Sequence, residues 1–427
     1  MMNYQFSEHL IFRTPLKPVK LNFSDDELVE LFNEKVAKEA LFLASPSLYQ
    51  AFEKWQENRM HSIKTQEKLF NSLRKYALRM HNRATPFGLF ASCGTAQWAK
   101  TASEPIRLSA YYRRTKLDMH YSVALSQYLD KQPYIQPYLH FYPNSSIYLL
   151  GNEFRYIEYY YQNHKRIHQI SAVDASVYVR LVLEKAQNGA TIHVLSEHIT
   201  NENIALEEAK DFIQLMIDAQ LLVSELEPTV SGGDLMDQLI HTLGNIEKIA
   251  PSPSLHRMLS LMVTIQKKLN SIDQFMGNAI TDYHHIIDLL AEIGVAYEVD
   301  KLFQTDLFTA HQAHYVLPSA FQPQLRKVLK VLNCLQPAKE LPTLQTFITK
   351  FQERYETQSI PLLTALDTET GVGYGDHLNH SGDLSPLIQE MIVPTADEDR
   401  HITLNQENAF LFSKLQEAQR NQAYSIN

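Results

Sequence analysis

The sequence predicts an α+β fold of several subdomains, with an embedded winged helix-turn-helix unit. Segments with the hydrophobic period of amphipathic helices alternate with aromatic, strand-like segments along most of the chain. Between residues 145 and 226, aromatic strands are followed by three helices and a terminal strand. We therefore expect three parts: an N-terminal α+β part at residues 1–144, the winged helix-turn-helix unit at 145–227, and a mainly helical part at 228–427.

The composition is that of an ordinary globular protein. Hydrophobic residues make up 44% of the 427 residues and charged residues 20%, and no apolar run approaches the length of a membrane span. Two distant cysteines, Cys93 and Cys334, cannot form a disulfide framework, and the N-terminus does not resemble a signal peptide. We expect a cytoplasmic protein without membrane insertion. No metal site is predicted, because His311 and His314 are not accompanied by a third ligand signal.

Charge is distributed unevenly along the chain. Residues 54–116 contain 13 Lys and Arg against three Glu, a balance of +10 that leaves −19 for the rest of a chain whose total is −9. A local basic field inside an acidic protein is typical of a polyanion footprint. A solvated helix face explains part of the asymmetry.

The stretch from Ser72 to Thr95 combines a basic helix with a Pro-Gly turn. Arg79 and Arg83 are four residues apart, so they project from one helix face, and Pro86 ends the helix before Thr85. Two arginines beside a hydroxyl suit an oxyanion or phosphate ligand. A solvated basic helix beside a buried turn is the structural alternative.

The remaining elements are predicted from periodicity. Strands are expected at residues 4–13, 107–113 and 297–309. Helices are expected at residues 25–43, 47–58, 62–83, 117–129, 234–249, 255–271, 323–335 and 343–356. We expect residues 272–291 to be less regular and the stretch after Gly375 to be poorly patterned. The run of glycines at 371–375 lacks the Lys-Ser/Thr pair of a phosphate loop.

The unit at 145–227 favours a peptide ligand over DNA. Its third helix, residues 205–219, carries four acidic residues and one lysine, and an acidic face repels phosphates. A peptide can instead add a strand to the edge of the hairpin and place apolar side chains against this helix. The predicted peptide contacts are Tyr156, Ile157, Tyr159, Phe212 and Leu215. A purely structural subdomain is the alternative.

Five separated motifs resemble those of one enzyme family. The most specific is RMHNRATPFGLFASCG at residues 79–94. The others are FRTPLKP at 12–18, KLDM at 116–119, QTDLF at 304–308 and FQERYETQSIPLLTALDTETGVGY at 351–374. Together they resemble the N-terminal glutamylation region of lantibiotic dehydratases, the tRNA-dependent enzymes of class I lanthipeptide biosynthesis.

The resemblance implies a reaction in two halves. Glutamate is transferred from glutamyl-tRNA to Ser and Thr side chains of a precursor peptide, and it is then eliminated to leave dehydroamino acids. The resemblance implies that the leader of this precursor binds to the winged helix-turn-helix unit. Glutamyl-tRNA acts as a co-substrate, and no cofactor is implied. The implied catalytic residues are Arg13, Arg79, Arg83, Thr85, Asp118 and Asp306.

Because tRNA is the expected polyanion, basic residues between 54 and 116 are predicted to contact it. These are Lys64, Lys68, Arg74, Lys75, Arg113 and Arg114. Family members with both activities are longer than this chain, so we expect elimination to depend on a separate elimination-domain protein or a further part. A cyclase and a homodimer are further expected partners. Two alternatives stay open: a peptide aminoacyl-tRNA ligase and a non-catalytic leader-binding protein.

Overall fold

The computed structural model describes residues 5–60, 62–101, 111–162, 165–229, 231–309, 315–335, 341–368, 370–375 and 406–422. The chain divides into two compact units. The first contains residues 1–158 and 172–320, and the second contains residues 159–171 and 321–427. The boundary at residue 320 therefore falls inside the third predicted part, 228–427. Both helices and strands are present, which confirms the predicted α+β class.

The largest sheet of the first unit joins strands from distant parts of the chain. Its strand order is β1 (His9–Pro15), β2 (Gly88–Ala99), β9 (Phe303–Thr309) and β3 (Tyr111–Leu117), and β10 (Tyr315–Pro318) also pairs with β2. β1 runs antiparallel to β2, and β3 antiparallel to β9, whereas β2 and β9 are parallel. The end of β1, the start of β2, the start of β9 and the end of β3 therefore lie at the same end of the sheet.

The two faces of this sheet differ in burial. Arg113, Thr115 and Leu117 of β3 are buried, while Tyr112 and Arg114 between them are exposed. Thr305, Leu307 and Thr309 continue the buried face on β9. Helices α2 (Lys35–Ala44) and α10 (Pro253–Ile272) pack against the sheet. Because side chains alternate along a strand, one face is covered and the other carries the intervening residues, which we call the open face.

Four helices occupy the N-terminal region: α1 (Asp25–Asn33), α2, α3 (Pro46–Gln56) and α4 (Ile63–Asn82). The prediction of one helix over 25–43 was wrong. Glu34 has an extended backbone with φ −62° and ψ 132°, and it separates α1 from α2. The break lets each helix direct its own apolar side chains, such as Phe32 and Leu41, into the core. No Pro or Gly marks this position, so local signals could not reveal it.

The predicted order of elements between residues 145 and 226 is observed. β5 (Tyr148–Leu150), β6 (Glu153–Gln162) and β7 (Lys165–Asp174) form a sheet. The helices α6 (Val177–Lys185), α7 (Ile192–Ile199) and α8 (Leu206–Asp218) follow. The terminal strand β8 (Leu222–Ser224) pairs with β4 (Phe141–Pro143) rather than with the hairpin. The winged helix-turn-helix assignment of this unit stays a prediction.

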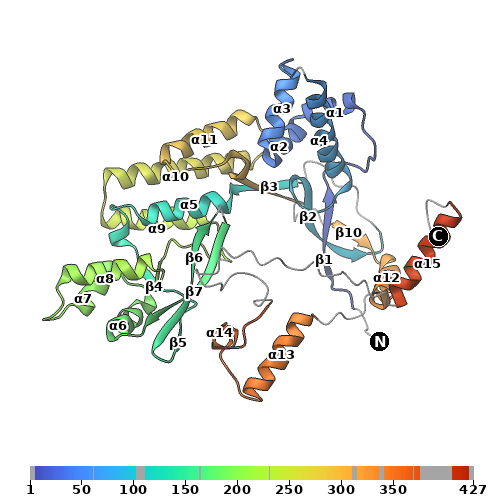
Figure 1. The fold of residues 1–427 in the computed structure, drawn as a ribbon. Coiled ribbons are helices and arrows are strands. Elements are labelled where there is room, and N and C mark those ends of the chain that lie inside the picture. Colours follow the sequence, from blue (N-terminus) through green and yellow to red (C-terminus); the bar gives the residue numbers. More distant parts are fainter. Residues whose placement is uncertain are drawn as a thin grey trace. The chain divides into compact units, whose positions relative to one another are not determined.

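Helical packing dominates the rest of the first unit. α5 (Met119–Asp130), α9 (Leu235–Ile249), α10 and α11 (Ile280–Ile293) have buried apolar faces, and α10 and α11 lie side by side in Figure 1. Residues 272–291 are thus more regular than predicted. Tyr283, Ile286, Leu290 and Ile293 are buried at helical spacing, which was the overlooked signal.

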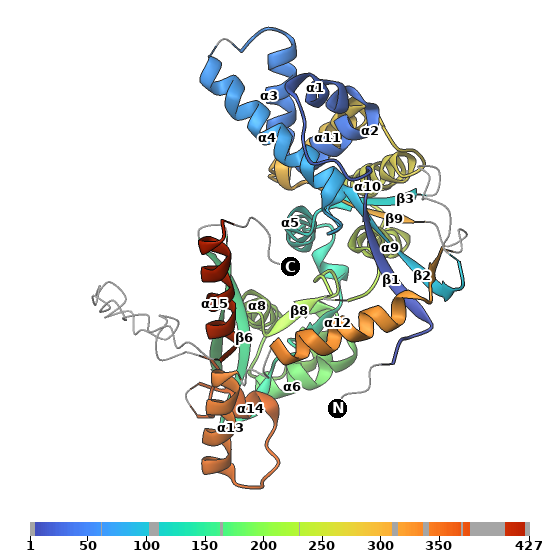
Figure 2. The same cartoon turned by 90° about the vertical axis from the view of Figure 1, so that its right-hand side faces the viewer.

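The second unit contains α12 (Phe321–Leu335), α13 (Pro342–Tyr355), α14 (Leu362–Leu366) and α15 (Gln406–Arg420). α15 was not predicted. α13 and α14 lie next to each other in Figure 2. Phe347 of α13 contacts Tyr374, which follows α14, with ring centroids 5.6 Å apart. In the part of the chain that the structure describes, no helix combines the length and apolarity needed to cross a membrane.

Candidate active site

The exposed face of α4 is basic. At 100° per residue, Lys64, Lys68, Lys75 and Arg79 fall within about 60° of arc, and the three lysines are exposed. The opposite face buries Leu69, Leu73, Ala77 and Met80 against the core. The same helix therefore anchors itself through one face and presents a row of cations on the other. Of the predicted tRNA contacts, Lys64, Lys68 and Lys75 lie on this basic face.

Two other predicted tRNA contacts have protein partners. Arg74 projects from the flank of α4, and its guanidinium lies 2.6 Å from the Asp25 carboxylate. Arg113 points to the covered face of the sheet, 2.5 Å from Glu39, and its side chain is 1% exposed. The Tyr283 hydroxyl, 2.7 Å away, also accepts a hydrogen bond from it. The prediction of a tRNA contact was therefore wrong for Arg113, because the strand alternation turns this residue inward.

The C-terminal end of α4 brings Arg79, Arg83 and Thr85 together. The guanidinium carbon of Arg79 lies 4.1 Å from the centre of the Phe87 ring. Burial, and then the nearby charge of Arg83, lower the pKa of Arg79, which still leaves an arginine protonated at neutral pH. Its Nε atom has no hydrogen-bond partner among the described residues. Arg83 and Thr85 are exposed, so two cations and a hydroxyl stand at one helix end.

The sheet holds the remaining predicted catalytic residues on or next to its strands. Gly88, at the start of β2, is in register with Asp306 of β9. Asp118 directly follows β3, and its N–H donates to the carbonyl of Leu302 just before β9, at 2.9 Å. Arg13 lies near the end of β1, in register with Cys93. One sheet thus holds residues that lie far apart in the chain, from Arg13 to Asp306.

Asp118 also has a structural role. Its carboxylate accepts a hydrogen bond from the N–H of His120 at 2.8 Å and so caps α5. Asp306 projects onto the open face, where Gln304 donates to its carboxylate at 3.2 Å. Arg114 faces Asp306 across the strands, is 61% exposed, and lies 3.6 Å from Asp234. Carboxylates and cations at this end can hold an ammonium, orient a hydroxyl and bind phosphates.

The open face carries residues that sequence reasoning missed. Tyr112 of β3 and Phe308 of β9 are cross-strand partners with ring centroids 5.2 Å apart. Phe87, in the turn before β2, is 38% exposed. It belongs to the motif at residues 79–94, but no role was predicted for it. The register of the sheet was needed to find the first pair, because β3 and β9 are far apart in the sequence. Within the described residues, no group of three or more His, Cys, Asp or Glu can hold a metal ion.

The predicted peptide contacts fall in different environments. Tyr156 is only 3% exposed, and its hydroxyl donates to the Ala219 carbonyl at 2.7 Å. This prediction was wrong, because the side chain anchors β6 to the end of α8. Ile157 is 39% and Leu215 66% exposed, and Phe212 is half-buried against the core. Tyr159 belongs to the second unit, where the Arg166 guanidinium lies 3.5 Å from its ring centre.

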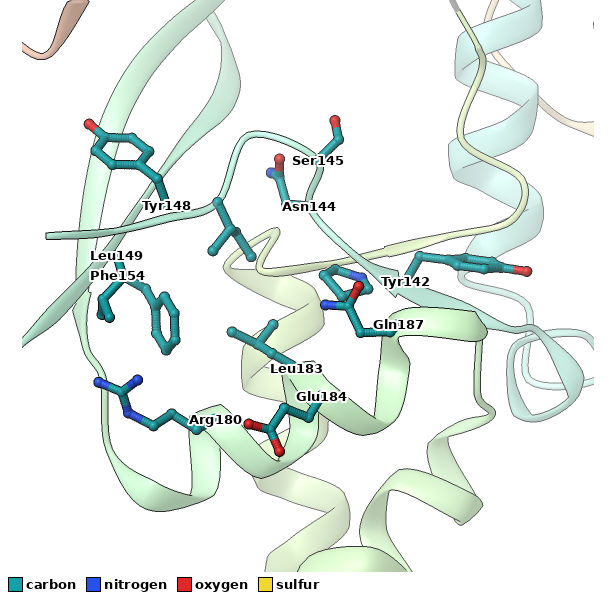
Figure 3. Close-up of a pocket in the computed structure, with 12 residues that line it drawn as sticks. Tyr142, Asn144, Ser145, Tyr148, Leu149, Phe154, Arg180, Leu183, Glu184 and Gln187 are labelled. Atoms are coloured by element: carbon teal, nitrogen blue, oxygen red, sulfur yellow. The ribbon is translucent and has the colours of Figure 1, made fainter. Parts of the chain in front are cut away.

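A pocket of about 560 Å³ lies between the β4–β5 segment, the start of β6 and α6 (Figure 3). Leu149, Phe154 and Leu183 give it an apolar lining, and Arg180 and Glu184 project from α6. Arg180 Nε donates to the Ala175 carbonyl at 3.0 Å, and its guanidinium lies 5.2 Å from the Phe154 ring centre. The pocket is on the α6 side of the unit, whereas the predicted peptide contacts Phe212 and Leu215 are on α8.

Comparison with known protein families identifies the class of this chain. The family described as "Lantibiotic dehydratase, N terminus" matches residues 33–427. The chain therefore belongs to the lantibiotic dehydratase family, and it corresponds to the N-terminal region of these proteins. This confirms the resemblance that the motifs indicated.

Three relatives are similar over most of this chain. The subtilin biosynthesis protein SpaB of Bacillus subtilis is 22% identical over 381 residues, which cover 87% of this chain and 36% of SpaB. The epidermin biosynthesis protein EpiB of Staphylococcus epidermidis is 20% identical, covering 92% of this chain and 40% of EpiB. The nisin biosynthesis protein NisB of Lactococcus lactis subsp. lactis is 22% identical, covering 81% of this chain and 34% of NisB. The chain spans between about a third and two fifths of their length.

Two solved structures have a similar fold. The tRNA dependent lantibiotic dehydratase MibB from Microbispora sp. 107891 gives a TM-score of 0.74 at 19% identity, covering 97% of this chain and 38% of MibB. The glutamylation domain TbtB from thiomuracin biosynthesis gives 0.56 at 16% identity, covering 93% of this chain and 47% of TbtB. The fold of this chain is thus that of dehydratase glutamylation domains.

Proposed function

We propose that this chain carries the glutamyl-tRNA-dependent half of lanthipeptide dehydration. It would transfer glutamate from glutamyl-tRNA to Ser and Thr side chains of a precursor peptide. The observation that carries the proposal is that the basic face of α4 leads through the turn to Gly88, which is in register with Asp306, while Arg13 on β1 and Asp118 after β3 belong to the same sheet. Family membership and the fold of a tRNA dependent dehydratase support it.

The basic face of α4 suits the tRNA backbone. Lys64, Lys68 and Lys75 are exposed, and each can neutralise a phosphate. Arg79 and Arg83 stand at the helix end, where planar guanidinium groups can bind phosphate oxygens in pairs. Arg114 is exposed on the neighbouring open face. The acceptor end of the tRNA would therefore arrive at the strand ends, beside the two carboxylates.

The transfer step needs positioning more than it needs a strong catalyst. The Ser or Thr hydroxyl oxygen attacks the carbonyl carbon of the glutamyl ester, and a new ester bond forms. The bond to the ribose oxygen breaks, and the hydroxyl proton passes to that oxygen. Arg79 and Arg83 would stabilise the negative charge that develops in this step. Asp306 or Asp118 would hold the glutamyl ammonium or orient the hydroxyl, while Thr85 and Arg13 line the approach.

The unit at 145–227 would bind the leader of the precursor as a winged helix-turn-helix. Leu215 is exposed on α8 and Ile157 on β6, so both can contact an apolar leader side chain. The backbone of Ile157 is already engaged, because its N–H donates to Ser146 at 2.8 Å and its carbonyl accepts from Asn144 at 3.1 Å. A leader strand would therefore pair elsewhere on the hairpin.

The test is incubation of this chain with glutamyl-tRNA and a Ser/Thr-rich precursor peptide carrying its leader. We expect a peptide mass increased by glutamyl residues, held as esters that hydroxylamine cleaves. Arg79→Ala and Arg83→Ala should abolish the gain, while Arg74→Ala, on the other flank of α4, should preserve most of it. A parallel reaction also contains the separately produced elimination part of a relative, because elimination is the second half of the dehydration.

Other outcomes favour the remaining alternatives. A gain that resists hydroxylamine is an amide, and it would identify a peptide aminoacyl-tRNA ligase. Leader binding that survives both arginine substitutions, without any binding of tRNA, would identify a non-catalytic leader-binding protein. Either result would overturn the proposed glutamyl transfer to hydroxyl groups.

A further inference from the structure

An aromatic pair of one exposed and one half-buried ring lies on the open face of the large sheet. The rings of Tyr112 and Phe308 are stacked, with centroids 5.2 Å apart and planes inclined by 20°. Tyr112 is 47% exposed although it lies within a strand. An aromatic pair in the core needs no ligand to explain it, but this pair keeps apolar ring surface in contact with water. The proposed transfer step gives it no role.

The surroundings of the pair are charged in an ordered way. Through the register of the sheet, Arg13, Cys93, Phe308 and Tyr112 form one row across β1, β2, β9 and β3. Arg114 and Asp306 form the next row of the open face, and Lys116 lies beyond Arg114 on β3. Three cations therefore frame the stacked rings. The carboxylate of Asp306 lies beside them, and Asp234 lies 3.6 Å from Arg114.

We propose that Tyr112 and Phe308 form a stacking platform for an unpaired nucleobase of the RNA substrate. Sheet faces that bind single-stranded RNA combine exposed aromatic rings, which stack on bases, with cations, which bind the backbone. Arg114, next along the open face of β3, would bind a phosphate of the same strand. A duplex cannot use such a platform, because its bases are stacked on one another.

The platform is placed to serve the reaction, and this step rests on the proposed function. Asp306 and Phe308 are two residues apart on the same face of β9, a separation of about 7 Å. A terminal base on the rings would therefore place the ester on its ribose close to Asp306. Arg13, two strands from Phe308, lies about 10 Å away, where it can contact a neighbouring phosphate. The platform would fix the unpaired 3′ end that carries glutamate.

The test measures binding of the full chain to a fluorescently labelled, unpaired RNA that ends in cytidine-cytidine-adenosine. Tyr112→Ala should weaken binding about 10-fold, in line with the loss of one stacked base. Tyr112→Phe keeps the ring and should bind within about twofold of the wild type. Tyr138→Ala, an exposed tyrosine outside the sheet, is the matched control and should bind like the wild type. The salt dependence should be unchanged by Tyr112→Ala, since no phosphate contact is lost.

Cys93 provides a second measurement that needs no substitution. It lies next to Phe308 in the row and is a free, half-buried thiol. The RNA should slow its alkylation, which peptide mass spectrometry distinguishes from alkylation of Cys334. Unchanged binding by Tyr112→Ala, equal losses in the Ala and Phe variants, preference for duplex RNA, or an unprotected Cys93 would each overturn the platform.

The two proposals can fail separately. If the wild type binds the unpaired RNA through Tyr112 but transfers no glutamate, the platform stands and glutamyl transfer does not. If the wild type transfers glutamate while Tyr112→Ala binds the RNA and reacts normally, glutamyl transfer stands and the platform does not.

Discussion

The guanidinium of Arg79 lies over the ring of Phe87, 4.1 Å from its centre, across the turn that joins α4 to β2. Phe87 in turn contacts the fully buried Phe90, with ring centroids 5.8 Å apart. This contact chain connects the half-buried Arg79 to the core. It holds Arg79 near Arg83 although the two like charges repel each other.

The contact predicts a role for Phe87 in tRNA binding. Phe87→Leu keeps an apolar side chain but removes the cation–π contact, worth ~0.5–1 kcal/mol at an exposed site. We expect glutamyl-tRNA affinity to fall about threefold, and Arg79→Lys to lower it further, because lysine lacks the planar guanidinium. Filter binding measures both. Phe275→Leu, 69% exposed and outside α4 and the sheet, is the control. Equal affinity of Phe87→Leu and the wild type would contradict the role.

Substitutions of Asp118 can separate its helix cap from its proposed chemistry. Asp118→Asn keeps an N-cap side chain, whereas Asp118→Ala removes it and should cost ~1 kcal/mol of the free energy of unfolding. Both should lose glutamyl transfer, because the negative charge is absent. Urea unfolding and the glutamylation assay measure the two effects. Full activity of Asp118→Asn would show that Asp118 acts only as a helix cap.

His81 predicts a loss of stability in mild acid. Burial lowers the pKa of His81 below its usual 6.5, and the charges of Lys17 and Lys20 act in the same direction, while a hydrogen bond to the Pro18 carbonyl at 2.6 Å opposes them. Below about pH 6.5 the unfolded chain therefore binds a proton that the folded chain resists. Stability should fall as pH drops through this value and be fully present above it.

Urea unfolding at pH 7.5 and 5.5 measures the effect of His81. The variant His81→Gln should lose less stability between the two pH values than the wild type, whatever its stability at pH 7.5. His198→Gln, at an exposed position of α7, should keep the dependence of the wild type. If His81→Gln and the wild type show the same pH dependence, another group is responsible.

The buried charges beneath the sheet predict a large stability effect. Glu39 is fully buried and bonds to Arg113, to the Tyr283 hydroxyl at 2.7 Å and to the N–H of Gly277 at 2.8 Å. Glu39→Gln removes the nearer of the two carboxylates beside Arg113, leaving Asp273 at 3.5 Å, and should cost about 3 kcal/mol. Glu57→Gln breaks an exposed pair with Arg59 and should cost less than ~1 kcal/mol. Similar midpoints in urea for both variants would refute the burial argument.

Local sequence signals predicted the elements that carry the site. The basic face of α4 follows from residue spacing alone, since the helical period fixes which side chains share a face. The Pro86–Gly88 turn was predicted in the same way, and Gly88 has a φ of +51°, which favours glycine. The family resemblance also came from the sequence, because its motifs are local strings of residues.

Tertiary structure decided the partners of these elements. Alternation along β3 shows that Arg113 and Arg114 face opposite sides, but not which side is covered. That depends on α2 and α10, which come from distant parts of the chain and bury Arg113 against Glu39. Likewise, no local signal pairs Tyr112 with Phe308 or brings Asp306 to Gly88, because strand register is fixed by packing across the whole sheet. The sequence by itself determined the basic helix α4, the turn that follows it and the family, while only the fold determined which charges are buried and which are exposed.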